Sequence, residues 1–140
     1  MPIQPAPIGD PAYSETLPRT AESVRDARQL VLSALHVWGL DSYEDSALLV
    51  VTELVANAVV HAQHAQVRVT VTLCGPRRVR IAVVDRSLRM PERCKAEAGD
   101  ERGRGLEIVE ALADVWDVDR LRRGKRVWAE LTAPEASPDE

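Results

Sequence analysis

Several residue types are scarce or missing in this chain, and their scarcity excludes whole classes of protein. Phenylalanine is absent, and three tryptophans and two tyrosines are the only aromatic residues. So few aromatic side chains argue against a stacking platform for single-stranded nucleic acid. The two cysteines, Cys74 and Cys94, lie far apart without a CxxC partner. This arrangement excludes a disulfide scaffold and a four-cysteine zinc site.

Long hydrophobic runs are also missing. No run approaches the roughly 20 apolar residues needed to cross a bilayer, and the start of the chain lacks the basic and apolar regions of a secretion signal. We therefore expect a cytoplasmic protein with reduced thiols and no membrane partner. The net charge of −4 argues against binding nucleic acid over the whole surface. A length of 140 residues, 45% of them hydrophobic, is typical of one globular domain.

Both ends of the chain differ from its centre in composition. Residues 1–12 contain four prolines, and the last eight residues contain two prolines and three acidic residues. Proline-rich and acidic ends without apolar periodicity are typical of tails. We predict flexible tails at 1–12 and 133–140 around a single domain formed by residues 13–132.

The hydrophobic pattern of this domain changes between helical spacing and strand alternation. The expected order is a strand at 13–17, helices at 20–39 and 41–63, a hairpin at 66–84, a helix opening at 103, and a hairpin at 116–131. Residues 86–102 have no clear period and are interpreted as a long loop, which is often a functional lid. This order predicts an α+β two-layer sandwich, with a mostly antiparallel mixed sheet and about three helices on one face.

Three polar residues, Glu53, Asn57 and His61, recur at intervals of four on the most strongly patterned helix. Each interval turns the helix about 40° beyond a full turn, so the three form a ridge along one side. A carboxylate and an amide oxygen are ligands that Mg²⁺ accepts together with waters and phosphates, and a carboxylate can act as a general base. The alternative is a solvated helix face, and His61 alone is more often packed or capping.

Two further features are weak signals when taken alone. Gly103 and Gly105 flank Arg104 at the start of the third helix, where free N–H groups and a close backbone approach suit a phosphate. An ordinary glycine-rich loop end is the alternative. Asp85 ends a valine-rich strand, where its carboxylate either accepts from an exocyclic amine or simply stops the strand.

Taken together, the order of these features resembles the GHKL ATPase superfamily, in its histidine-kinase-like branch with the Bergerat fold. Within that branch the chain is most similar to anti-sigma-factor serine/threonine-protein kinases and their single-domain actinobacterial relatives. The likeness spans about residues 14–132. It is carried by SVRDARQLVLSALHVWGLD (23–41), TELVANAVVHA (52–62), VVDRSLRMP (83–91), GRGLEIVEALADVWDV (103–118) and GKRVWAEL (124–131).

The resemblance implies a role for each matching residue. Asn57 would coordinate Mg²⁺, Glu53 would activate the acceptor hydroxyl or a water, and Asp85 would bond the amino group of adenine. The cofactors would be ATP and Mg²⁺, and residues 86–102 would form the ATP lid. The residues expected at the phosphates beneath that lid are Arg102, Gly103, Arg104, Gly105 and Leu106.

The chain also departs from the family pattern at three positions. Ser87 and Arg89 replace glycines that often follow the adenine-binding aspartate, and a Cβ there narrows the approach of the backbone to the base. Arg126 stands where relatives often carry a threonine beside that aspartate, so a linking hydroxyl is expected to be missing. These departures weigh against tight nucleotide binding and leave the expected fold unchanged.

The resemblance implies an ATP-binding transcription regulator that sequesters a sigma factor and phosphorylates an antagonist of the STAS type. Kinases of this kind are commonly homodimers. The first alternative is a degenerate ATPase-like domain that acts only as a protein-binding module. The second is nucleic-acid contact through a basic cluster at the last hairpin, which is more often a solvated turn. Its members are Arg120, Arg122, Arg123, Lys125 and Arg126.

Overall fold

The computed structural model describes residues 10–61, 65–85 and 101–133. Within this part the chain forms five strands and three α-helices in the predicted order. A short 3-10 turn, Asp41–Tyr43, leads into the second helix. The elements are β1 (Ala12–Pro18), α1 (Ser23–Val37), α2 (Glu44–His61), β2 (Gln66–Gly75), β3 (Arg78–Asp85), α3 (Glu101–Leu112), β4 (Val115–Leu121) and β5 (Gly124–Thr132).

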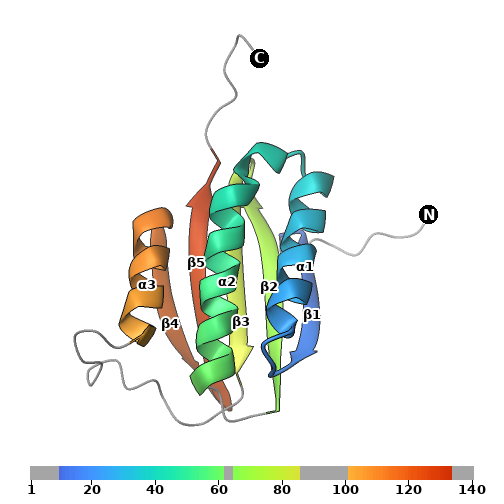
Figure 1. Ribbon diagram of the computed structural model, residues 1–140. Helices are drawn as coiled ribbons and strands as arrows, with labels where there is room; N and C mark the ends of the chain where they lie inside the picture. Colours follow the sequence, from blue (N-terminus) through green and yellow to red (C-terminus); the bar gives the residue numbers. More distant parts are fainter. Residues whose placement is uncertain (1–9, 62–64, 86–100, 134–140) are drawn as a thin grey trace.

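The strands form one sheet in the order β1-β2-β3-β5-β4, and the helices cover one of its faces (Figure 1). This arrangement confirms the predicted α+β sandwich. Every described pair of neighbouring strands is antiparallel, so the sheet contains none of the parallel pairing that a mixed sheet would have. None of the described helices is both long enough and apolar enough to span a bilayer.

The core lies between the sheet and the helices. Alternate residues of β2, among them Val67, Val69 and Val71, are fully buried on the helix-covered face. Leu54 and Val55 of α2 are buried against them. Burying side chains of this kind contributes roughly 1.5–3 kcal/mol each, so the alternation of the strands and the apolar stripe of α2 together fix which faces meet.

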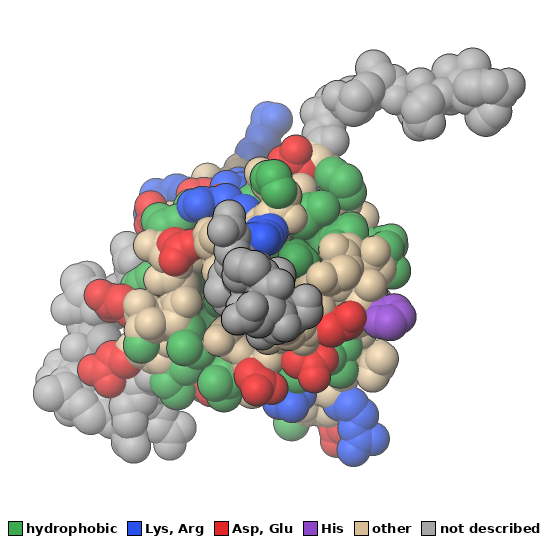
Figure 2. Space-filling model, turned by 90° about the horizontal axis from the view of Figure 1, so that it is seen from above, with side chains coloured by type: hydrophobic (Ala, Val, Ile, Leu, Met, Phe, Trp, Pro, Cys, Tyr) green, Lys and Arg blue, Asp and Glu red, His purple; other side chains and the backbone are tan. Residues whose placement is uncertain are grey.

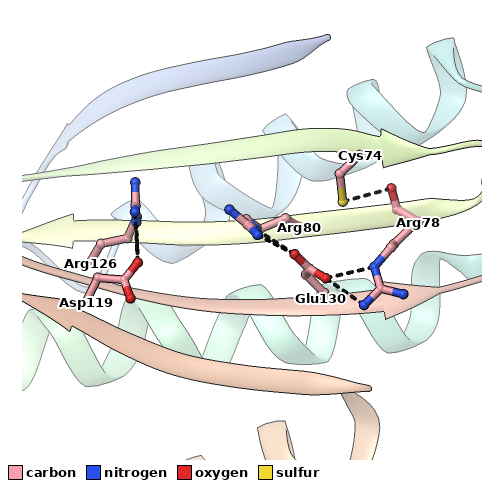
Figure 3. Close-up of polar contacts among 6 residues, drawn as sticks. All are labelled: Cys74, Arg78, Arg80, Asp119, Arg126 and Glu130. Carbon is pink, nitrogen blue, oxygen red and sulfur yellow. Dashed lines mark hydrogen bonds and ion pairs between the residues drawn. The ribbon is translucent and has the colours of Figure 1, made fainter. Parts of the chain in front are cut away.

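The opposite face of the sheet is polar, and Glu130 lies at the centre of its charged side chains (Figure 3). Its carboxylate accepts hydrogen bonds from Arg78 Nε at 2.7 Å and from Arg80 Nε at 2.9 Å. The Arg80 guanidinium also lies 4.6 Å from the ring centre of Trp128. Burial raises the pKa of Glu130, but the two arginine hydrogen bonds outweigh burial and leave that pKa lowered.

A lowered pKa makes Glu130 a source of stability that depends on pH. The contribution is present above the usual glutamate pKa of about 4.3 and is lost as the pH falls through the lower pKa of the folded state. We expect Glu130→Gln to lower the free energy of unfolding at pH 7 by about 1–3 kcal/mol, the cost of losing charge-assisted hydrogen bonds. Urea unfolding of both proteins at pH 7 and pH 3 measures this.

At pH 3 the difference between the two proteins should shrink, because the Glu130 carboxyl of the unfolded parent then binds a proton that the folded state binds only at lower pH. Glu110→Gln is the matched control, since Glu110 is exposed on α3 and should change stability by no more than about 0.5 kcal/mol. An equal loss for Glu130→Gln at both pH values would contradict the assigned charge network.

Candidate functional site

The predicted site residues come from segments that meet at one end of the sheet. Helix α2 runs toward this end and finishes at His61, β3 finishes at Asp85, α3 begins at Glu101 and β5 begins at Gly124 (lower end in Figure 1). Helix α2 contacts both β3 and α3. The topology therefore brings the last turns of α2, the end of β3 and the start of α3 to the same end of the domain.

A hydrogen bond between α2 and α1 shows which side of α2 carries the polar ridge of Glu53 and Asn57. Thr52 faces α1, because its Oγ1 accepts a hydrogen bond from Arg28 Nη1 at 3.1 Å. At about 100° per residue, Glu53 lies about 100° and Asn57 about 140° around the helix from Thr52. Since α2 lies between α1 and α3 (Figure 1), Asn57 is on the α3 side. Both Glu53 and Asn57 are partly exposed.

Asp85 is buried and forms an ion pair that the sequence analysis missed. It lies opposite Lys125 in the register of β3 and β5, and Lys125 Nζ donates to Asp85 Oδ2 at 2.6 Å. Only 3% of the Asp85 side chain and 8% of the Lys125 side chain are exposed. Strand alternation carried a signal for this pair, because Lys125 has the same parity as the buried residues Val127 and Ala129.

The expectation that Arg126 stands beside Asp85 is wrong. Arg126 pairs with Val84 in the sheet and lies on the polar face, where its Nη2 donates to Asp119 Oδ2 at 2.8 Å (Figure 3). Successive residues of a strand point to opposite faces. The side chain next to Asp85 on β5 is therefore that of Lys125. The departure from the family pattern beside Asp85 is the ammonium of this lysine.

The basic cluster at the last hairpin is smaller than its sequence suggests. Two of its members form ion pairs, Lys125 with Asp85 and Arg126 with Asp119. The other three are exposed near the β4–β5 turn: Arg120, Arg122 and Arg123. At the other end of the domain, the view in Figure 2 shows acidic, basic and hydrophobic side chains intermixed, without a wide area of one charge among the described residues. Neither arrangement favours the nucleic-acid alternative.

Helix α3 begins at Glu101, two residues earlier than its glycines predict. An acidic residue in the first turn is favoured by the helix dipole, which is a physical reason for the earlier start. The N–H groups of the N-cap and of the first three residues of a helix have no partner within it, and in α3 the described ones belong to the backbone of residues 101–103. Arg102, Gly103 and Arg104 are thus in the first turn, Gly105 follows, and Leu106 is half-buried.

Other predicted features lie outside the described residues. Ser87 and Arg89 are among them, together with residues 86–100 of the expected lid, the side chains of residues 101–105 and that of His61. The expected roles of these groups therefore stay predictions.

The donor set on α2 suits a metal ion that arrives with a ligand. Among residues 10–61, 65–85 and 101–133, no group of three or more His, Cys, Asp or Glu side chains could hold a metal ion. Asn57 and Glu53 offer one amide oxygen and one carboxylate. Mg²⁺ commonly takes only one or two protein ligands and completes its shell with waters and substrate phosphates. The residues present thus fit Mg²⁺ bound as a nucleotide complex.

A family model for the histidine kinase-like ATPase domain matches residues 17–131, which include all the described strands and helices in whole or in part. The chain belongs to the histidine kinase-like ATPase domain family. This membership agrees with the GHKL resemblance. No curated protein matches this histidine kinase-like ATPase domain.

Two solved structures share the fold of this histidine kinase-like ATPase domain. One contains the RsbU and RsbW domains of Rv1364c from Mycobacterium tuberculosis, with a TM-score of 0.69 and 23% identity over 91% of this chain. The other is the histidine kinase domain of the Erythrobacter litoralis EL346 blue-light activated histidine kinase, with a TM-score of 0.54 and 18% identity over 83% of this chain. The chain covers 34% of the first structure and 61% of the second.

Proposed function

We propose that this domain binds Mg·ATP where α2, β3 and α3 meet and works as a regulator of the anti-sigma kinase type. The observation that carries the proposal is that the last turns of α2, which hold Asn57, the end of β3, which holds Asp85, and the start of α3 lie at one end of the sheet. They come from separate parts of the chain, and the topology places at that end an amide, a carboxylate and a glycine-rich helix start, which are the kinds of group that suit Mg²⁺, an exocyclic amine and phosphate. Family membership supports the same ligand.

Each group would contact a different part of the nucleotide. Asp85, at the end of β3, would accept a hydrogen bond from the amino group of adenine. The N–H groups in the first turn of α3 that have no partner within the helix would bind phosphate oxygens, since a helix N-terminus favours anions. Asn57 would hold Mg²⁺, which neutralises charge on the phosphates when it is bound.

Glu53 would act as the general base of phosphoryl transfer. The oxygen of a serine or threonine hydroxyl forms a bond to the γ-phosphorus, the bond to the bridging oxygen breaks, and ADP leaves. The hydroxyl proton passes to the Glu53 carboxylate. Glu53 precedes Asn57 by about one turn, so the base and the Mg²⁺ ligand would lie along the same side of α2.

The proposed partners follow from the same resemblance. The substrate would be a STAS-type antagonist, and the sequestered protein would be a sigma factor. One similar structure carries an RsbW domain by name, which supports this choice. The domain would act in the cytoplasm as a homodimer.

A second function is favoured by one specific observation. Asp85 already bonds the ammonium of Lys125 in a buried pair. If this pair closes the base end of the site, the domain is a degenerate ATPase-like module that binds a protein partner without turnover.

A fluorescent ATP analogue, titrated with and without Mg²⁺, separates the two functions. For the ATP-binding regulator we expect saturable binding that Mg²⁺ strengthens, because Asn57 would hold the ion and the ion would offset the charge of the phosphates. Unlabelled ATP should displace the analogue. Absence of binding under both conditions, together with binding of a sigma factor encoded in the same genome, would establish the module instead.

A further inference from the structure

The Asp85–Lys125 pair is a buried charged group that the proposed reaction does not use. We propose that Lys125 is a second nucleobase-binding residue, so that the pair recognises two neighbouring polar groups on one edge of adenine. Asp85 would accept from the 6-amino group, and the Lys125 ammonium would donate to ring nitrogen 1. This inference rests on the proposed function and adds to it the residue that selects the base.

The position of Lys125 supports direct contact with a base. It follows Gly124 at the start of β5, on the helix-covered side of the sheet and at the end where α2, β3 and α3 meet. Its Nζ lies 2.6 Å from Asp85 Oδ2. A group that accepts or donates a hydrogen bond close to Asp85 Oδ2 therefore also lies near the ammonium.

The pair is expected to stay together when the base binds. Separating a buried ion pair leaves two poorly solvated charges, and a neutral amino group does not replace the lost attraction. A lysine ammonium has three N–H donors, and the hydrogen bond to Asp85 uses one of them. The ammonium thus has the capacity to donate to a ring nitrogen while it remains paired.

The chemistry of adenine matches this pair of protein groups. Its nitrogen 1 is an acceptor directly beside the 6-amino donor, so one edge presents an acceptor and a donor side by side. The ammonium and the carboxylate present a donor and an acceptor side by side. Guanine has a carbonyl acceptor at position 6 and a donor at position 1, so its substituents at these two positions are reversed.

Competition by ATP and 1-deaza-ATP tests the proposed contact. In 1-deaza-ATP a C–H group replaces nitrogen 1, and the 6-amino group remains. The parent protein should bind ATP roughly 10- to 100-fold more tightly than 1-deaza-ATP, the usual range for losing a hydrogen bond to a charged group. In Lys125→Met this ratio should fall to within about twofold of one, because the donor is gone.

Two further variants keep the test independent of folding. Asp85→Asn/Lys125→Met removes both buried charges, so it avoids an unpaired carboxylate if Lys125→Met fails to fold. It should bind both nucleotides more weakly and without preference. Arg126→Met is the matched control: it breaks an ion pair one residue along β5 on the opposite face and should keep the parental ratio. Circular dichroism melting confirms that each variant folds.

The outcomes separate this inference from the proposed function. Tight ATP binding with equal affinity for 1-deaza-ATP in the parent would overturn the role of Lys125 and leave nucleotide binding intact. A preference that persists without Lys125 would overturn it as well, and so would GTP that competes as strongly as ATP. Failure of the parent to bind any of these nucleotides would overturn both proposals.

Discussion

Replacement of Glu53 by glutamine is expected to slow phosphoryl transfer by roughly 10²–10⁴-fold, the usual contribution of general base catalysis. The amide keeps the shape of the side chain and removes its capacity to accept a proton. Glu53 is partly exposed on α2, so neither the fold nor the affinity for nucleotide should change much. Transfer of radiolabel from ATP to a STAS-type antagonist gives the rate, and nucleotide titration gives the affinity.

Asp45→Asn is the matched control for this prediction. Asp45 is an exposed acidic residue in the first turn of the same helix, about 12 Å from Glu53 along the helix axis. Its loss should leave the transfer rate close to that of the parent. Parental transfer by Glu53→Gln would show that another group, or water, takes the proton.

Much of the fold could be predicted because its signals are local. The alternation of Val67, Val69 and Val71 predicts which face of β2 is buried, and these residues are fully buried. Gly39 predicts the end of the first helix, and it has the positive φ of 73° that glycine adopts without strain. Signals of this kind need only the period of a few neighbouring residues.

The pairing of Asp85 with Lys125 could not be predicted from such local patterns. The two residues are separated by α3 and β4, and the distance between them depends on the register of β3 against β5. A shift of one residue along a strand exchanges the two faces of the sheet. The prediction that Arg126 lies beside Asp85 is wrong by this one residue, because Lys125 is the residue of β5 that pairs with Asp85.

The second large effect is expected at Asn57, the proposed ligand of Mg²⁺. We expect Asn57→Ala to weaken Mg·ATP binding at least tenfold, because even residues that only orient a metal ligand typically contribute roughly 10–100-fold to metal affinity. Mg²⁺ keeps a strict octahedral shell, so a lost oxygen ligand is poorly replaced. Titration with the fluorescent ATP analogue, at saturating Mg²⁺ and in its absence, measures the change.

The loss should be confined to the Mg²⁺-dependent part of binding. Asn57 is partly exposed, and alanine is the better helix former by up to about 0.7 kcal/mol, so the melting temperature should hold or rise slightly. Asn57→Asp retains an oxygen ligand and should keep more of the Mg²⁺ effect than Asn57→Ala. If Asn57→Ala binds Mg·ATP as tightly as the parent, the metal ion is held elsewhere and the ridge on α2 is a solvated helix face.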